Sequence, residues 1–252
     1  MPGYYASRLP NADDSHEDYL VAVLRRRIEA SPGVFIDIGV NIGQTLAKVI
    51  GIDRGRRYLG FEPQISCCYN VDQFLRLNEL HNAAVLPIAL ADCNRMLTFY
   101  SHGEFDEMAG LATGSGNGAG ARRANFVPAR IGDEVLRELG IEDICAIKID
   151  VEGAELQVLR GLRETLRAGN PSVIFEVLPN FHGKTERIMH AQPECARNQA
   201  SADAIYALLR GAGYDIFQID DAGGETRIDR FELNDRVNYA GNNYIAHRRG
   251  LA

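Results

Sequence analysis

The sequence predicts an α/β protein built on an open, mostly parallel sheet with helices on both faces. Two largely apolar runs of strand length, Val34–Ile38 and Ile144–Ile149, have the composition expected of strands buried on both faces of a parallel sheet. Each is followed by a turn and then by a segment with helical spacing, which begins at Gln44 in the first case and at Glu155 in the second. Strands that alternate with helices in this way favour a parallel sheet with helical connections.

The length and composition favour a single α/β domain. A chain of 252 residues that is 46% hydrophobic can bury a large core. We assign residues 1–32 to an N-terminal helical extension, in which Asp18–Ala30 has the pattern of an amphipathic helix. Residues 33–252 are then expected to form the domain itself.

The charge and the cysteine pattern exclude several classes of protein. Lys and Arg number 27 against 34 Asp and Glu, and the net charge of −7 argues against a general nucleic-acid or anionic-membrane binder. No apolar run approaches the roughly 20 residues of a membrane span. The five cysteines show no C-x-x-C spacing. We therefore expect a soluble, reduced, cytoplasmic protein with no nucleic-acid or membrane partner.

The turn after the first strand is the first candidate binding element. Asp37 lies near the carboxyl end of the strand, and Gly39 and Gly43 bracket Asn41, so that a ligand can approach the main chain closely. A dinucleotide fingerprint needs three glycines, but Asn41 and Gln44 occupy its second and third positions. This pattern favours a nucleotide-like ligand without a pyrophosphate, such as S-adenosylmethionine. The alternative is a turn whose two glycines serve only its geometry.

The second and third strands carry further candidates for cofactor binding. Tyr58–Glu62 reads as a strand, and nucleotide folds place a ribose-binding acid at the end of the second strand, roughly 20 residues beyond the glycine turn. Glu62 occupies that position, and its alternative interpretation is a solvated strand-end glutamate. A third strand is expected over Ala84–Ala89, with Ala89 to Asp92 beside an adenine ring.

A glycine-rich segment, Gly110–Gly120, holds five glycines in eleven residues, a composition that disfavours helix and strand. We expect a mobile loop, which is either a lid over the substrate side or a plain linker.

The central strand, Ile144–Ile149, leads into the second candidate site. Lys148 needs a partner if it is buried, and Asp150 should emerge at the carboxyl end beside the glycine turn. Glu152 and Glu155 are explained equally well as acids that favour the dipole of the following helix.

The rest of the chain supplies the remaining elements. A polar connection over Leu178–Gln199 contains His182, and the stretch Asp220–Asn242 is turn-rich and acidic. The expected strands are Met96–Tyr100, Ser172–Val177 with Glu176 near its end, Tyr214–Ile219 and Asn243–His247. The expected helices are Ile65–Leu77, Gly132–Leu139 and one marked by Ile205, Leu208 and Leu209.

Several blocks occur in an order that resembles the FkbM-type methyltransferases, which are S-adenosylmethionine-dependent enzymes that O-methylate hydroxyls of sugars and natural products. The blocks are Asp37–Gly43, Phe61–Pro63, Ala89–Asp92, Ile147–Glu155 with Leu159–Gly161, and Ile174–Val177. The resemblance runs from about Val34 to Arg248, and the block Ile147–Glu155 is its most specific part.

That resemblance implies a Rossmann-like class I methyltransferase fold, with a seven-stranded, mostly parallel sheet, the last strand antiparallel, and helices on both faces. The cofactor contacts that it implies are Asp37, Gly39, Asn41, Gly43, Glu62 and Asp150. Where the family usually shows Leu-Asp ahead of the central strand, this chain has Ile131-Gly132-Asp133. The glycine-rich loop and the 179–203 connection are individual to this chain and would shape the acceptor pocket, so the acceptor stays open, as does the oligomeric state.

Methyl transfer to a hydroxyl needs alignment of donor and acceptor and a base that removes the proton. Asp150, Glu152, Glu176 and His182 compete for the role of base, and we place Asp150 first. The alternative is a divalent metal held by Asp150 and Glu176, since oxygen ligands suit Mg²⁺.

Two rival functions share these features. An NAD-type dinucleotide-binding oxidoreductase would share the sheet and the ribose acid, although the missing middle glycine argues against it. A non-catalytic interaction protein that keeps a cofactor cleft is the other rival.

Overall fold

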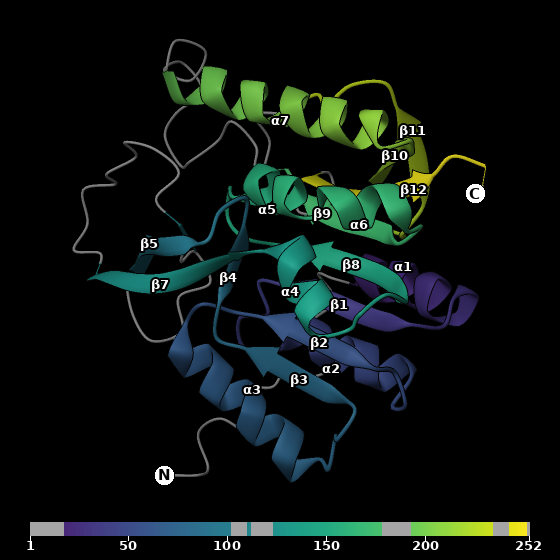
Figure 1. The fold of residues 1–252 in the computed structure, drawn as a ribbon. Helices are drawn as coiled ribbons and strands as arrows, with labels where there is room; N and C mark the ends of the chain where they lie inside the picture. The colour runs from purple at the N-terminus through teal and green to yellow at the C-terminus, as the bar shows by residue number, and fades with distance from the viewer. Residues whose placement is uncertain (1–17, 102–109, 112–122, 178–192, 234–241, 251–252) are drawn as a thin grey trace.

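The structure is a computed structural model that describes residues 18–101, 110–111, 123–177, 193–233 and 242–250 (Figure 1). Within these ranges the helices are α1 (Asp18–Ala30), α2 (Gln44–Ile52), α3 (Ile65–Leu77), α4 (Gly132–Glu138), α5 (Glu155–Gly161), α6 (Arg163–Ala168) and α7 (Pro193–Gly211). The strands are β1 (Val34–Ile38), β2 (Tyr58–Phe61), β3 (Ala83–Leu86), β4 (Ala89–Ala91), β5 (Arg95–Ser101), β6 (Gly110–Leu111), β7 (Arg123–Ile131), β8 (Ile144–Ile149), β9 (Ser172–Glu176), β10 (Tyr214–Ile219), β11 (Glu225–Ile228) and β12 (Asn243–Arg248).

The main sheet is open and mostly parallel, as the sequence predicts. In the described part of the chain its strand order is β11-β10-β12-β9-β8-β1-β2-β3, and the strands from β9 to β3 run parallel to their neighbours. The chain order reverses between β1 and β8. Open α/β sheets bind their ligands at such a switch point, outside the carboxyl ends of the strands.

The last strand, β12, is antiparallel to both of its neighbours, as expected. The expected count of seven strands needs one correction, because the described sheet has an eighth strand, β11. This four-residue strand lies within Asp220–Asn242, a stretch expected to be turn-rich, and it pairs antiparallel with β10. Edge strands are commonly short and carry charged side chains, as β11 does, so it gives little hydrophobic pattern.

A second, four-stranded sheet has the order β4-β7-β5-β6 and lies beside the main sheet in Figure 1. The expected third strand over Ala84–Ala89 is therefore wrong in part. It ends at Leu86 in β3, and Ala89 begins β4, which pairs with β7 in the other sheet. Gly110–Leu111 also corrects the expectation for the glycine-rich segment, since these two residues pair with β5 as β6. The rest of that segment, residues 112–120, lies outside the described residues.

Two apolar cores cover the two faces of the main sheet. Alternate residues of β1 point to opposite faces, so Ile36 and Ile38 pack with α4, α5, α6 and α7, whereas Phe35 packs with α1, α2 and α3. Helices thus lie on both faces, as expected. The amphipathic helix α1 buries Val23 and Leu24 completely in the second of these cores.

The connection between α4 and α6 explains why this chain has Gly132-Asp133. A Cβ at Gly132 would lie 2.6 Å from Leu162 Cδ2, so a larger residue there would require the buried Leu162 side chain to shift. Asp133 is 9% exposed and accepts 2.8 Å hydrogen bonds from the main-chain amides of Glu164 and Thr165, which lie in the first turn of α6. The two residues tie α4 to the start of α6.

Two further points concern the C-terminal half. Helix α7 begins at Pro193, earlier than expected, because the polar connection was taken to run to Gln199. Within the described ranges, every helix is too short or too polar to cross a bilayer.

Candidate active site

A cavity of about 330 Å³ opens at the carboxyl ends of β1, β2, β8 and β9. This volume lies in the range of small-molecule sites, which is roughly 300–1,000 Å³. Seven of the predicted catalytic and cofactor-binding residues line it, namely Gly39, Asn41, Glu62, Ala89, Asp150, Glu152 and Glu176. Asp37, Gly43 and Asp92 are not part of its lining, and His182 lies outside the described residues.

The glycine turn forms the floor of the cavity. Gly39, Asn41 and Gly43 all have positive φ angles, of 89°, 49° and 93°. Gly39 is also fixed by space, because a Cβ there would lie 1.8 Å from the carbonyl oxygen of Asp150. Gly43 precedes α2 and serves the turn without reaching the cavity. The close approach of Gly39 to Asp150 brings the ends of β1 and β8 together.

Glu62 is held at the end of β2 by two main-chain amides. Asn41 N donates to its Oε2 and Gln64 N donates to its Oε1, both at 2.8 Å. The residue is only 6% exposed, and burial raises the pKa of its carboxyl to about 7, although these two hydrogen bonds act in the opposite direction. Each oxygen keeps a lone pair with which it can accept a further hydrogen bond.

Asp37 lies beneath the glycine turn and is fully buried. Its Oδ2 accepts a 2.5 Å hydrogen bond from the Tyr58 hydroxyl, while its Oδ1 has no hydrogen-bond partner among the described residues. Burial raises the pKa of Asp37 to about 6, against the opposing influence of the Lys148 charge. The structure thus places Asp37 in the packing below the cavity instead of in its wall.

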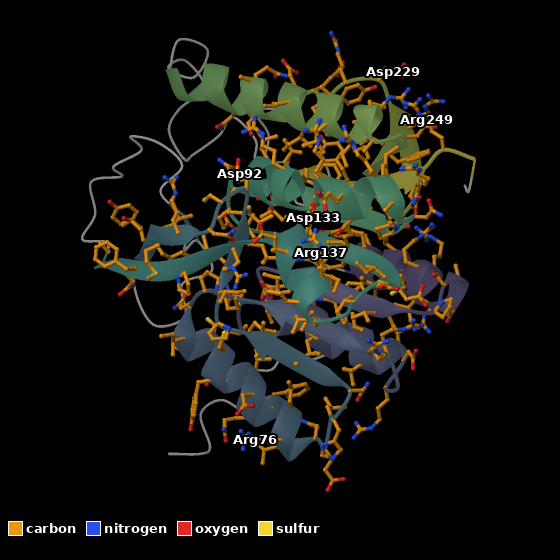
Figure 2. All side chains as sticks on the ribbon, in the orientation of Figure 1. Arg76, Asp92, Asp133, Arg137, Asp229 and Arg249 are labelled. Carbon is orange, nitrogen blue, oxygen red and sulfur yellow. The ribbon has the colours of Figure 1, made fainter. Side chains whose placement is uncertain are left out.

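Ala89 and Asp92 separate, although they are neighbours in sequence. Ala89 begins β4 and lines the cavity. Asp92, labelled in Figure 2, is exposed and lies 3.8 Å from Nη1 of Arg160 in α5. An exposed ion pair of this kind contributes little to stability. Asp92 therefore does not line the cavity, and its place beside an adenine stays a prediction.

Lys148 has the partner that its burial requires. Its Nζ lies 2.8 Å from Oδ2 of Asp150, and the two side chains are 10% and 41% exposed. Lys148 pairs in register with Asp37 on β1, so the two side chains share one face of the sheet. One oxygen of Asp150 is thus engaged with an ammonium while the residue lines the cavity.

Asp150 also belongs to a group of three carboxylates. Asp150, Glu152 and Glu176 each bring one oxygen within 4.8 Å of the others. Burial, together with the charges of Asp150 and Glu152, raises the pKa of Glu176 to about 8. A carboxyl whose pKa lies near neutrality is suited to accepting a proton.

Two contributors to this site were not assigned by sequence. Phe99 of β5 lines the cavity and is 4% exposed, because the second sheet brings it there. Glu155 is 4% exposed and accepts hydrogen bonds from the loop before α5. No local sequence signal marks Phe99. Glu155 was visible in the sequence, but its position in the first turn of a helix already had an ordinary explanation through the helix dipole.

The fold and the cavity define a class of α/β enzyme that binds a nucleotide-like cofactor at the switch point of its sheet. Within that class, residues 37–216 match the family model described as the methyltransferase FkbM domain. The chain therefore belongs to the FkbM methyltransferase family, with a class I methyltransferase-like fold, and is an S-adenosylmethionine-dependent methyltransferase. The family assignment replaces the dinucleotide-binding oxidoreductase as an interpretation of this cleft.

Comparisons with individual proteins give more distant similarities. The chain is 26% identical over 221 residues to the AMB antimetabolite synthetase AmbE of Pseudomonas aeruginosa, which covers 75% of this chain and 10% of that protein. The chain thus spans about a tenth of the length of this curated relative.

Among solved structures, a putative caffeoyl-CoA O-methyltransferase from Staphylococcus aureus has a TM-score of 0.49 at 13% identity, covering 96% of this chain and 87% of that one. An O-methyltransferase from Bacillus cereus in complex with SAH has a TM-score of 0.48 at 10% identity, covering 97% of this chain and 86% of that one.

Proposed function

We propose that the protein transfers the methyl group of S-adenosylmethionine to a hydroxyl of a sugar or natural-product acceptor. The observation that carries this proposal is the division of the cavity by the glycine turn. Glu62 lies on the β2 side of that turn, and Asp150, Glu152 and Glu176 lie on the β8 and β9 side. One side suits a ribose and the other suits a reacting hydroxyl.

On the cofactor side, Glu62 accepts hydrogen bonds from the ribose hydroxyls. Its carboxylate is already fixed by Asn41 N and Gln64 N, so little side-chain entropy is lost when the ligand binds. Ala89 offers an apolar surface for the adenine, and the glycine turn lets the ligand approach the main chain. When bound, S-adenosylmethionine supplies a methyl group that its sulfonium charge activates.

On the acceptor side, Glu176 is the preferred base. No hydrogen bond to its carboxylate is present within the described residues, whereas Asp150 is engaged with Lys148 at 2.8 Å. The acceptor oxygen attacks the methyl carbon, the carbon–sulfur bond breaks with its electron pair going to sulfur, and the hydroxyl proton passes to Glu176. We therefore prefer Glu176 to Asp150 as the base, and Asp150 becomes the residue that orients the acceptor.

The curated relative supports a natural-product acceptor. AmbE is by name an antimetabolite synthetase, and the present chain matches a tenth of its length. A region of an antimetabolite synthetase that resembles this chain would act during synthesis of the antimetabolite. By this similarity we include a natural-product acceptor in the proposal. The specificity for a hydroxyl is a separate part of the proposal.

A divalent cation is the second route to an activated hydroxyl. The three carboxylates supply the oxygen donors that Mg²⁺ prefers, and their ligand atoms lie within 4.8 Å of one another. The ammonium of Lys148 already neutralises part of this charge, which reduces the need for a cation. We therefore place the metal second to the carboxylate base.

The test has two stages. Calorimetry measures S-adenosylmethionine binding, and transfer of a labelled methyl group is then followed to a panel of sugars and polyhydroxylated metabolites, each with its amine analogue. Every reaction is run with EDTA and with Mg²⁺. We expect binding, and transfer to a hydroxyl that EDTA leaves unchanged. Transfer only to the amine analogues contradicts O-methylation, and loss of activity in EDTA assigns the carboxylates to a cation.

A further inference from the structure

The loop between β8 and α5 has an unusual backbone. Glu152 and Gly153 are consecutive residues with positive φ angles, of 53° and 99°. For a residue with a side chain, the left-handed conformation is disfavoured because its Cβ lies too close to the backbone. Asp150, Val151, Glu152 and Ala154 of this loop all line the cavity. The conformation that costs energy is thus the one that presents the loop to the site.

Glu155 is the residue that holds this conformation. It is the first residue of α5, and its Oε1 accepts hydrogen bonds from Gly153 N at 3.1 Å and from Val151 N at 3.4 Å. The side chain therefore reaches back over the loop instead of out to water. An apolar side chain at this position would leave both amides without that partner, at a cost of a hydrogen bond each.

A favourable interaction with the helix dipole does not explain why Glu155 is buried. It is 4% exposed, and burial raises the pKa of its carboxyl to about 7. By contrast, Glu164 lies in the first turn of α6 with a side chain that is 74% exposed and pairs with Arg137. An acid that only favours a helix dipole can stay in water, as Glu164 does.

We propose that Glu155 is a positioning residue of the methyl-transfer site, which folds the 150–154 loop so that the carboxylates of Asp150 and Glu152 face Glu176 across the cavity. This inference rests on the proposed function for its catalytic meaning. Its structural content is that two loop amides depend on the acceptor oxygen of Glu155. Glutamine keeps that oxygen, aspartate is one methylene shorter, and alanine removes it.

The test compares Glu155→Gln, Glu155→Asp and Glu155→Ala with the matched control Glu164→Ala. Amide hydrogen exchange and the NMR signals of Val151 and Gly153 report on the loop, and calorimetry reports S-adenosylmethionine affinity. We expect Glu155→Ala to speed exchange of these two amides. Because the loop begins at Asp150, whose carbonyl packs against Gly39 of the glycine turn, its loosening should also weaken S-adenosylmethionine binding on the order of 10-fold. Glu155→Gln should restore both properties to within a few-fold, and Glu164→Ala should match the wild type.

Two results overturn the proposal. One is a folded Glu155→Ala protein with unchanged exchange at Gly153 and unchanged affinity. The other is a Glu155→Gln protein as impaired as the alanine variant, which would assign the role to the charge. If Glu155→Ala does not fold, Glu155→Asp decides: faster exchange at these amides supports the proposal, and wild-type behaviour overturns it. If the wild type binds no S-adenosylmethionine, the proposed function fails. Amide exchange at Val151 and Gly153 still tests whether Glu155 fixes the loop.

Discussion

The main-chain amide of Asn41 donates a 2.8 Å hydrogen bond to Oε2 of Glu62. This contact joins the glycine turn after β1 to the end of β2, so the floor and one wall of the cavity are built as a unit. Because Asn41 has a positive φ angle, the turn must adopt a left-handed conformation to aim its amide at Glu62. The ribose-binding role that we propose for Glu62 therefore depends on the turn as much as on the carboxylate.

Replacing Glu62 by alanine removes a charged acceptor from the cofactor side of the cavity. A hydrogen bond to a charged group contributes roughly 1.5–3 kcal/mol, so S-adenosylmethionine binding should weaken by roughly 10- to 100-fold. Calorimetry measures the change. Glu138→Ala is a suitable control, since Glu138 is a surface residue with a 60% exposed side chain. Unchanged affinity in a folded Glu62→Ala protein would remove Glu62 from the site.

Replacing Glu176 by glutamine tests the identity of the base. If Glu176 accepts the proton, turnover should fall by roughly two to four powers of ten while S-adenosylmethionine affinity stays within a few-fold. Single-turnover kinetics and calorimetry separate the two quantities. Asp150→Asn is the comparison, and a larger loss of turnover in that variant would move the role of base to Asp150.

Gly39→Ala should be strongly destabilising. The new Cβ would lie 1.8 Å from the carbonyl oxygen of Asp150, and the φ angle of 89° disfavours any side chain. The free energy of unfolding should fall by more than about 3 kcal/mol, as measured by urea unfolding. Gly51→Ala is the matched control, because Gly51 lies in α2 and a Cβ added there would have no atom within 4 Å. Alanine there should be neutral or should stabilise by up to about 1 kcal/mol. Equal stability of the two variants would show that Gly39 and Asp150 do not approach so closely.

Stability should decrease as the pH rises from about 5.5 to 8.5. The pKa values of Asp37, Glu62, Glu155 and Glu176 are raised to about 6, 7, 7 and 8, chiefly by burial. For a carboxyl with a raised pKa, the folded state binds the proton more tightly than the unfolded state. The stabilisation is thus complete below the ordinary pKa and is lost as the pH rises through the folded value.

Each proton held only by the folded state changes the free energy of unfolding by about 1.4 kcal/mol per pH unit. Urea unfolding at constant ionic strength measures this slope. Glu225 has the opposite behaviour, because hydrogen bonds from His247 and Arg26 outweigh burial and lower its pKa to about 2, but its contribution changes only below about pH 4.5 and lies outside the window. Combining Glu62→Gln with Glu176→Gln should flatten the slope. A free energy of unfolding that rises with pH over this range would contradict the carboxylate environments described above.

The sequence by itself determined the elements whose signals are local. The apolar runs of β1 and β8, the glycine turn and the helix that begins at Glu155 follow from the order of neighbouring residues. It also determined that Glu62, Asp150 and Glu176 share a cavity. Each lies at or just after the carboxyl end of a parallel strand, and these ends meet at one edge of the sheet whatever the loops do.

Only the tertiary structure decided which strands pair and which faces the polar groups occupy. Ala89 leaves the third strand because β7, much later in the chain, offers it a partner in a second sheet, and the same sheet carries Phe99 into the cavity. Asp37 is buried because both faces of β1 are covered by apolar cores, and Asp92 lies at the surface beside Arg160. Strand pairing and burial depend on contacts between distant segments, which the spacing of residues along the chain does not encode. The contact of Glu155 with Val151 and Gly153 likewise depends on how the loop folds.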